Sequence, residues 1–221
     1  MNSKIEDMSN FFDLRAKSYD THMKKNVDNF NVFYKRVSKP IIKTNKKVNI
    51  LDLGCGTGLE LKNIFKKCPN AQIDCLDLSK EMLEVLKEKY KDRQSQIKTI
   101  TASYLDYSFK EQKYDYILSV MSFHHILHKT KLNLYISIYK ALNPDGLYIE
   151  GEYVVNQTKE SRLYKEYLKV KEEKNIEIDG TFHIDIPFSI KTQKQLFDET
   201  GFKTFQLHYH ENEAAVYSVK K

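Results

Sequence analysis

An apolar strand that runs straight into three alternating glycines constrains this chain more than any other feature of its sequence. The strand pattern covers residues 48–53, Gly54, Gly56 and Gly58 follow it, and a helical pattern begins immediately afterwards. Glycine lets the backbone turn sharply and lets a ligand approach without a Cβ in the way. The start of the helix adds free N–H groups and a partial positive charge. The unit therefore predicts a ligand site at the end of this strand.

The spacing of the glycines indicates which class of ligand binds at this site. A dinucleotide site uses G-x-G-x-x-G, which would need glycine at position 59, where this chain has Leu59. The G-x-G-x-G spacing, preceded by Asp52, favours another adenosine ligand. Asp77 closes the next predicted strand 25 positions after Asp52. A carboxylate there can accept hydrogen bonds from two ribose hydroxyls, which would hold a nucleoside beside the glycine loop.

The rest of the chain alternates apolar runs with helical patterns, which predicts an α/β fold. A Rossmann-like, doubly wound sheet of seven strands is expected, mostly parallel, with helices on both faces. Only four polar residues separate the last two strands, so these form an antiparallel hairpin at one edge of the sheet. A capping box of Thr192 and Gln195 begins the last helix, and Gly201 ends it. The predicted strands span 48–53, 71–76, 97–101, 114–119, 147–155, 202–209 and 214–219, with helices at 59–67, after Ser79 and at 132–142.

Two segments lie outside this alternating core. Residues 1–45 form an aromatic-rich, helical N-terminal cover, and residues 46–221 form the ligand-binding domain, with a helical insertion at about 156–190. Ligands of open α/β sheets bind at the carboxyl ends of the strands. We therefore expect both segments to cover that edge and to determine what binds there.

Composition and charge exclude several classes. A chain of 221 residues with 41% hydrophobic residues is an ordinary globular domain rather than a disordered chain. The net charge is +6, but only four scattered arginines contribute, so nucleic acid is a disfavoured partner. The three cysteines show no metal or disulfide spacing, the first residues lack an apolar signal core, and no apolar run could span a bilayer. These features predict a cytoplasmic protein with no membrane association.

Five stretches together resemble the class I S-adenosylmethionine-dependent methyltransferases, in particular the broad methyltransferase-domain group that acts on small molecules. The resemblance covers nearly the whole chain. LDLGCGTG resembles the first motif of that family, and it is highly specific in combination with Asp77. The other four stretches are FFDLRAKSYD near the start, CLDLSKEML, YDYILSVMSFHHI and LNPDGLYIEGE.

The resemblance implies S-adenosyl-L-methionine as cofactor and S-adenosyl-L-homocysteine as product, with Asp77 binding the ribose, Met82 near the adenine and Tyr19 over the cofactor. The residues that it places around the cofactor are Tyr19, Asp52, Gly54, Cys55, Gly56, Gly58, Asp77, Leu78, Met82, Ser103, Tyr104, Ser119, Val120 and His124. One position departs from the pattern: many relatives carry an Asp that accepts the adenine amino group where this chain has Ser103. A hydroxyl accepts that bond more weakly, the Tyr104 N–H remains available, and Asp106 is an alternative acceptor.

The sulfonium of this cofactor is already an activated electrophile, so positioning and desolvation can supply most of the rate. His124 and His125 follow the fourth strand near the expected methyl group. Either one of them acts as general base or both pack the loop. Tyr19 is a further candidate, because aromatic faces attract cations, or else a packing residue.

Four further residues have open roles. Glu152 and Tyr153 either line the acceptor pocket or, for Glu152, end a strand in solvent, and His183 and Asp185 either close over the acceptor or belong to an ordinary loop. His124 and His128 would share a helix face, but no carboxylate or cysteine lies near them in the sequence, so no metal is expected.

Methyl transfer to an unidentified small-molecule acceptor is thus the leading hypothesis for function. One alternative is modification of a tRNA base with S-adenosylmethionine or its carboxylated form. A second alternative is a non-catalytic cofactor-binding module. The sequence predicts neither the acceptor nor the oligomeric state.

Overall fold

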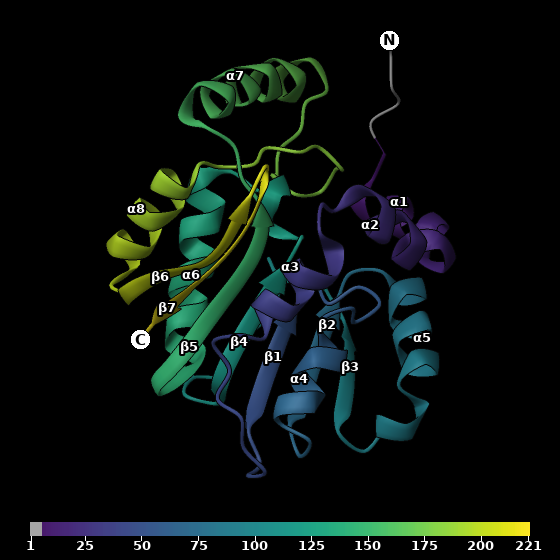
Figure 1. The fold of residues 1–221 in the computed structure, drawn as a ribbon. Coiled ribbons are helices and arrows are strands. Elements are labelled where there is room, and N and C mark those ends of the chain that lie inside the picture. Colours follow the sequence, from purple (N-terminus) through teal and green to yellow (C-terminus); the bar gives the residue numbers. More distant parts are fainter. Residues whose placement is uncertain (1–5) are drawn as a thin grey trace.

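The computed structural model describes residues 6–221, which build one seven-stranded sheet (Figure 1). The strand order is β3-β2-β1-β4-β5-β7-β6. Neighbours from β3 to β5 pair in parallel, and β7 runs antiparallel to both β5 and β6. The predicted fold class, with its antiparallel hairpin at one edge, is confirmed. The strands are β1 (Asn49–Leu53), β2 (Gln72–Asp77), β3 (Ile97–Thr101), β4 (Tyr114–Val120), β5 (Leu142–Tyr153), β6 (Lys203–Glu211) and β7 (Ala214–Lys220).

Helices cover both faces because successive residues of the central strands point to opposite sides of the sheet. In β1, Ile50 packs in a cluster with helices α3, α4 and α5, whereas Leu51 and Leu53 pack with α6 and α8. All three side chains are fully buried, as expected for a parallel strand covered on both faces. The covering helices are α3 (Phe30–Val37), α4 (Leu61–Lys67), α5 (Lys80–Lys89), α6 (His128–Ala141) and α8 (Ile190–Thr200).

Several element boundaries differ from the sequence-based expectation; α6, for example, begins at His128 rather than at residue 132. The predicted Thr192 capping box is wrong: Ser189 caps α8, because its side chain accepts a hydrogen bond from the Thr192 N–H. Strand β5 begins at Leu142 rather than at Leu147. Leu142 already pairs with Tyr114, and residues 143–146 then form an irregularity before regular pairing resumes.

The remaining helices lie at the carboxyl ends of the parallel strands (Figure 1). Helices α1 (Met8–Arg15) and α2 (Tyr19–Asn26) stand above β1, β2 and β3, and α7 (Gln157–Glu173) stands at the same end, beyond the hairpin. Helix α7 buries only Tyr167, and polar contacts such as that of Glu160 with the Ser189 N–H at 3.0 Å attach it to the rest of the protein. No helix among residues 6–221 has the length and apolarity needed to cross a membrane. Whether the segments before 46 and around 156–190 act as separate covers stays a prediction.

Candidate active site

The glycine loop adopts a backbone that L side chains rarely adopt. Gly54 and Gly56 have φ values of +68° and +50°. The Gly54 N–H donates a hydrogen bond to the Leu76 carbonyl at 2.8 Å, which ties the loop to the end of β2. A Cβ on Gly54 would lie 2.0 Å from the Ser122 Oγ. Close packing and positive φ therefore both require glycine here.

Asp77 lies at the end of β2 with its carboxylate already oriented. The Gly56 N–H donates to its Oδ2 at 2.7 Å, and the Ser79 N–H donates to its Oδ1 at 2.8 Å. Burial raises the pKa of Asp77 to about 6, although these backbone donors oppose the shift. Each carboxylate oxygen keeps a second lone pair for a ligand hydroxyl.

A cavity of about 580 Å³, counting the part that opens to solvent, lies between the glycine loop and the N-terminal helices. Eight of the residues predicted to surround a cofactor line it together: Tyr19, Gly54, Gly56, Asp77, Leu78, Met82, Ser103 and Tyr104. The lining also includes residues that the sequence analysis did not single out, among them Met8, Phe12, Leu105, Met121, Ser122 and Gly180. Met121 has a positive φ of 50° directly after β4, a backbone feature that the sequence does not reveal.

Six predicted cofactor residues do not line this cavity. His124 lines a second hollow instead, and the other five are Asp52, Cys55, Gly58, Ser119 and Val120. All five are buried. Burial and the nearby Glu60 raise the pKa of the Asp52 carboxyl well above its usual range. These residues lie in the layer that supports the loop, and their contact with a cofactor stays a prediction.

A second hollow of about 1090 Å³, counting its open part, adjoins the first. The two share Phe12, Tyr19, Met121 and His125. The second hollow alone is lined by Phe11, Arg15, Ser18, His22, Met23, His124, Tyr153, His183 and Asp185. The structure thus brings both predicted histidines, Tyr153 and the loop pair His183 and Asp185 to one place.

His124 and Glu152 form a buried pair at the base of the second hollow. The His124 Nδ1 lies 2.5 Å from Glu152 Oε1, and the Phe123 N–H donates to Oε2 at 2.7 Å. Burial lowers the pKa of His124, but the Glu152 carboxylate outweighs it and the net shift is upward. Burial raises the pKa of Glu152, and His124 reverses that shift. Glu152 is fully buried, which excludes the alternative of a strand end in solvent.

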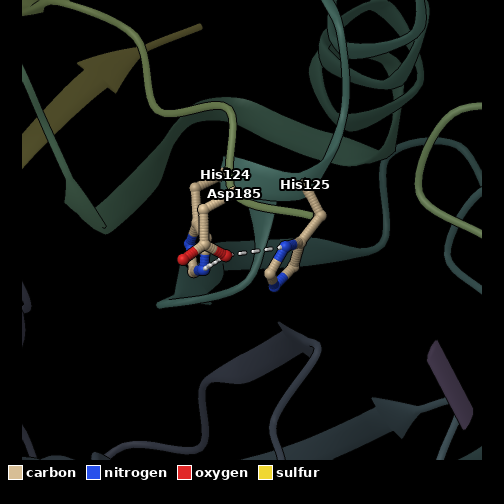
Figure 2. A group of neighbouring side chains, drawn as sticks. All are labelled: His124, His125 and Asp185. Atoms are coloured by element: carbon tan, nitrogen blue, oxygen red, sulfur yellow. Dashed lines mark ion pairs between the residues drawn. The ribbon is translucent and has the colours of Figure 1, made fainter. Parts of the chain in front are cut away.

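His125 and Asp185 lie beside His124 (Figure 2). The His125 Nδ1 lies 3.1 Å from the Ile184 carbonyl oxygen and 3.3 Å from Asp185 Oδ1. Asp185 Oδ1 also lies 3.7 Å from His124 Nε2. His128, in contrast, starts α6 on an exposed surface and lines a different depression with Tyr164 and Phe188. His124 and His128 therefore do not share a helix face, because His124 lies in a short 3₁₀ turn that ends before α6 begins at His128.

The strand order, the reversed β7 and the glycine loop followed by an acidic strand end define the fold of the class I methyltransferases. Residues 50–146 match the family model described as Methyltransferase domain. Malonyl-[acyl-carrier protein] O-methyltransferase 1 of Ilyobacter polytropus is 33% identical over 138 residues, covering 61% of this chain and 47% of that protein. Carboxy-S-adenosyl-L-methionine synthase of Nautilia profundicola is 24% identical over 98% of this chain and 96% of its own length.

Two solved structures share the fold. DhpI in complex with S-adenosylhomocysteine has a TM-score of 0.70 at 13% identity, over 96% of this chain and 94% of its own. Phosphoethanolamine N-methyltransferase 2 of Haemonchus contortus has a TM-score of 0.60 at 20% identity, over 79% of this chain and 38% of its own. The match over residues 50–146 and these relatives support a class I S-adenosylmethionine-dependent methyltransferase with S-adenosylmethionine as its cofactor. The chain spans about half the length of the malonyl-[acyl-carrier protein] relatives that it matches.

Proposed function

We propose that this chain transfers a methyl group in line from the sulfonium of S-adenosylmethionine to a small-molecule acceptor. The observation that carries this proposal is the pair of adjoining cavities. One is formed by the glycine loop and Asp77, the other by a cluster of polar side chains, and four side chains separate them. Such a pair can hold the donor on one side and the acceptor on the other.

The lining of the first cavity offers a contact for each part of the cofactor. Asp77 accepts the ribose hydroxyls, since both of its oxygens are fixed and keep a free lone pair. Leu78 and Met82 pack against the adenine, with Ser103 and the Tyr104 N–H at its edge. The amino-acid tail lies against the glycine loop, where Tyr19 faces Gly56 at 3.7 Å from the position of a Cβ. In this proposed arrangement the sulfonium lies at the junction of the two cavities.

Tyr19 has a further role in this arrangement. Its ring lines both cavities, so its face can pack against the sulfonium cation. Burial raises the pKa of its hydroxyl far above the usual range, and the nearby Asp77 adds to the shift. Tyr19 therefore stays neutral and supplies a ring rather than a charge. Positioning and exclusion of water then supply most of the rate.

A second candidate function is the formation or use of carboxylated S-adenosylmethionine, for example in modifying a tRNA base. It is favoured by the similarity to the carboxy-S-adenosyl-L-methionine synthase of Nautilia profundicola, which extends over nearly the full length of both chains. Mass spectrometry of the nucleoside and of the acceptor after turnover separates the two candidates. Methyl transfer leaves S-adenosylhomocysteine and an acceptor heavier by one methyl group. Formation of the carboxylated cofactor leaves S-adenosylmethionine with a carboxyl group in place of one methyl hydrogen, and its use leaves S-adenosylhomocysteine and an acceptor that carries a carboxymethyl group.

Thermal unfolding with S-adenosylmethionine, S-adenosylhomocysteine and NAD tests the donor site. Either adenosyl ligand at about 100 times its dissociation constant should add ~2.7 kcal/mol to the free energy of unfolding, and NAD should add nothing. Asp77→Asn should abolish the gain, because the amide cannot accept from both ribose hydroxyls. Asp92→Asn, an exposed carboxylate on another element, is the matched control and should keep it.

Two results would contradict the proposal. One is the absence of any stabilisation of folded wild-type protein by either adenosyl ligand. The other is an Asp77→Asn variant that gains as much as Asp92→Asn does.

A further inference from the structure

We propose that His125 is the general base of the reaction, acting through its Nε2, and that the acceptor is therefore an uncharged group that must lose a proton, such as a hydroxyl or an amine. This inference rests on the proposed methyl transfer and names the acceptor class and the catalytic residue of that same site. Four properties support this assignment: the position of His125, its tautomer, its charge and the balance of the reaction.

The first step is position. Only Phe12, Tyr19, Met121 and His125 line both cavities, so the transferred methyl group must pass among them. Phe12 and Met121 cannot accept a proton. The Tyr19 hydroxyl has a pKa raised by burial, so it does not ionise to a base near neutral pH. His125 is the remaining group at the junction that can accept a proton.

The second step is the tautomer. Two oxygens face the His125 Nδ1, the Ile184 carbonyl at 3.1 Å and the Asp185 carboxylate at 3.3 Å. Both can only accept hydrogen bonds, so Nδ1 carries the proton and donates it. The lone pair of the neutral ring then lies on Nε2. That atom is buried and has no hydrogen-bond partner among residues 6–221.

The third step is charge. Burial lowers the pKa of His125 well below the usual range, and the adjacent His124 and His183 lower it further. The ring is therefore neutral before turnover. Asp185 lies beside Nδ1, where its carboxylate can stabilise the imidazolium once Nε2 has taken a proton, as the carboxylate does in a catalytic triad. The charged and titratable groups around His125 are Tyr19, His124, Lys131, Glu152, His183 and Asp185.

The fourth step is the balance of the reaction. The acceptor oxygen or nitrogen uses a lone pair to form a bond to the methyl carbon. The carbon–sulfur bond breaks, and its electron pair stays on sulfur as the thioether of S-adenosylhomocysteine. The acceptor proton moves to His125 Nε2. One positive charge thus passes from the sulfonium to the imidazolium, and no further reactant is needed.

The acceptor class follows from the presence of this base. A carboxylate has already lost its proton in water and needs no base. The Asp185 carboxylate, 57% exposed on the lining of the second hollow, would also repel an anionic acceptor. Arg15, the arginine of that lining, is already paired with Glu6 at 3.0 Å. An uncharged protic acceptor fits these surroundings better than a carboxylate does.

A metal ion is the competing occupant of the same group. One ligand atom each from His124, His125 and Asp185 lies within 4.8 Å of the others. Figure 2 shows dashed lines from the Asp185 carboxylate to both rings. The His125 Nδ1, however, is directed at the Ile184 carbonyl with hydrogen-bond geometry, so its lone pair is not free for a metal. The first test below therefore also measures whether a metal ion binds here.

The first test needs no acceptor. Protein with ¹⁵N-labelled histidine, saturated with S-adenosylhomocysteine at pH 7.5, gives the tautomer and charge of each ring by long-range ¹H–¹⁵N correlation. His125→Asn assigns the His125 signals, because the Asn amide can still donate to the Ile184 carbonyl. We expect a neutral His125 with its proton on Nδ1, and no change on adding one equivalent of Zn²⁺. A charged ring, a proton on Nε2, or stoichiometric Zn²⁺ binding at Nδ1 would overturn the proposal.

The second test uses phenol, aniline and benzoate as probe acceptors, because they share a ring and differ in the reacting group. Methylation is followed with S-adenosylmethionine labelled in the methyl group. We expect phenol or aniline to react in preference to benzoate, and His125→Asn to lower kcat by about 10²–10⁴-fold. The KM for S-adenosylmethionine should not change, and the acid limb of the kcat profile should disappear. His128→Asn, an exposed histidine outside both cavities, is the control.

Methylation of benzoate alone, or full activity of His125→Asn, would refute the base. If no probe reacts, the tautomer and charge of His125 in the histidine spectrum decide whether the proposal stands. Stabilisation by S-adenosylhomocysteine is measured on the same samples. Its absence would count against the proposed function, whereas its presence with a proton on Nε2 would count against this inference alone.

Discussion

At the scale of single residues, the donor site depends on a position where a side chain is missing. Gly54 combines a positive φ with a Cβ position that overlaps the Ser122 Oγ. An L residue in left-handed backbone costs about 1–2 kcal/mol, and the displacement of Ser122 adds to that cost. Gly201 also has a positive φ, +92°, but no atom lies within 4 Å of its Cβ position. Both glycines would suffer backbone strain on substitution, but only Gly54 would also suffer a steric clash. Comparing the two therefore distinguishes the effect of strain from the effect of close packing.

We predict that Gly54→Ala lowers both the free energy of unfolding and the affinity for S-adenosylhomocysteine, the latter at least about tenfold. Gly201→Ala should lower only the free energy of unfolding, by about 1–2 kcal/mol. Chemical denaturation and isothermal calorimetry measure the two quantities. An unchanged affinity in Gly54→Ala would show that the loop does not approach the ligand.

The proposed contact of the Asp77 carboxylate with the ribose makes cofactor binding depend on pH. Its pKa of about 6 lies above that of an unfolded chain, ~3.9, because of burial. In the ligand-free protein the folded state holds this proton more tightly. Its contribution to the free energy of unfolding therefore falls as the pH rises from about 4 to about 6. Ligand binding has the opposite dependence, since ribose hydroxyls need the ionised carboxylate.

We therefore predict that the affinity for S-adenosylhomocysteine is constant above pH 7 and falls about tenfold by pH 5. Calorimetric titrations between pH 5 and pH 8 measure this dependence. The isosteric Asp77→Asn variant should bind weakly and show no such fall. A wild-type affinity that stays flat down to pH 5 would disprove the assignment of the titrating group.

At the scale of elements, the N-terminal helices are attached to the donor site by polar contacts. Asp13 of α1 accepts a hydrogen bond from the Ser79 hydroxyl at 2.6 Å. Asp20 of α2 accepts one from the Thr57 hydroxyl at 2.5 Å and pairs with Lys89 at 2.6 Å. Both helices also contribute lining residues, Phe12 and Tyr19. Opening of this cover would therefore expose the cofactor.

We predict that the double substitution Asp13→Ala and Asp20→Ala loosens the cover without unfolding the sheet. Hydrogen exchange should become faster in residues 8–26 and stay unchanged in β1 and β4, and S-adenosylhomocysteine should dissociate several-fold faster. Glu88→Ala on α5, whose carboxylate pairs only with the exposed Lys91, is the control. Equal exchange rates in the double variant and the wild type would mean that apolar packing alone holds the cover.

The helices and strands were largely predictable from the sequence. The cluster of polar side chains at the second hollow, formed by His124, His125, Glu152 and Asp185, was not. Apolar runs bounded by turn residues predicted all seven strands, because buried parallel strands need such runs. The cap of α8 was misplaced because Ser189 and Thr192 have the same capping chemistry and only the backbone distinguishes them. The pairing of His124 with Glu152 joins residues 28 positions apart. It depends on β4 and β5 being neighbours in register, which no local pattern encodes.

At the scale of the whole molecule, one buried carboxylate, that of Glu150, joins two helices to two strands on one face of the sheet. Glu150 Oε2 accepts from the hydroxyls of Tyr135 and Tyr148, both at 2.7 Å. Glu150 Oε1 accepts from the Gln193 amide at 2.7 Å and the Tyr217 hydroxyl at 2.6 Å. These donors come from α6, β5, α8 and β7, so four elements converge on one side chain. All five residues are fully buried.

The loss of this carboxylate should affect the fold rather than the chemistry. Glu150→Ala leaves the buried hydroxyls of Tyr148 and Tyr217 without their acceptor, whereas the Tyr135 hydroxyl keeps Gln193 Oε1 at 3.2 Å and the Gln193 amide keeps the Tyr217 hydroxyl at 2.7 Å. It also removes a negative charge near the buried Lys131, whose pKa is lowered chiefly by burial and raised by Glu150. We predict a loss of about 3–5 kcal/mol in the free energy of unfolding. Glu150→Gln should cost less, because its amide keeps one acceptor oxygen and the tyrosine hydroxyls can rotate to accept from its NH₂. Urea denaturation measures both, with Glu84→Ala as the surface control. If Glu150→Ala were as stable as Glu84→Ala, the cohesion of these four elements would have to come from their aromatic packing alone.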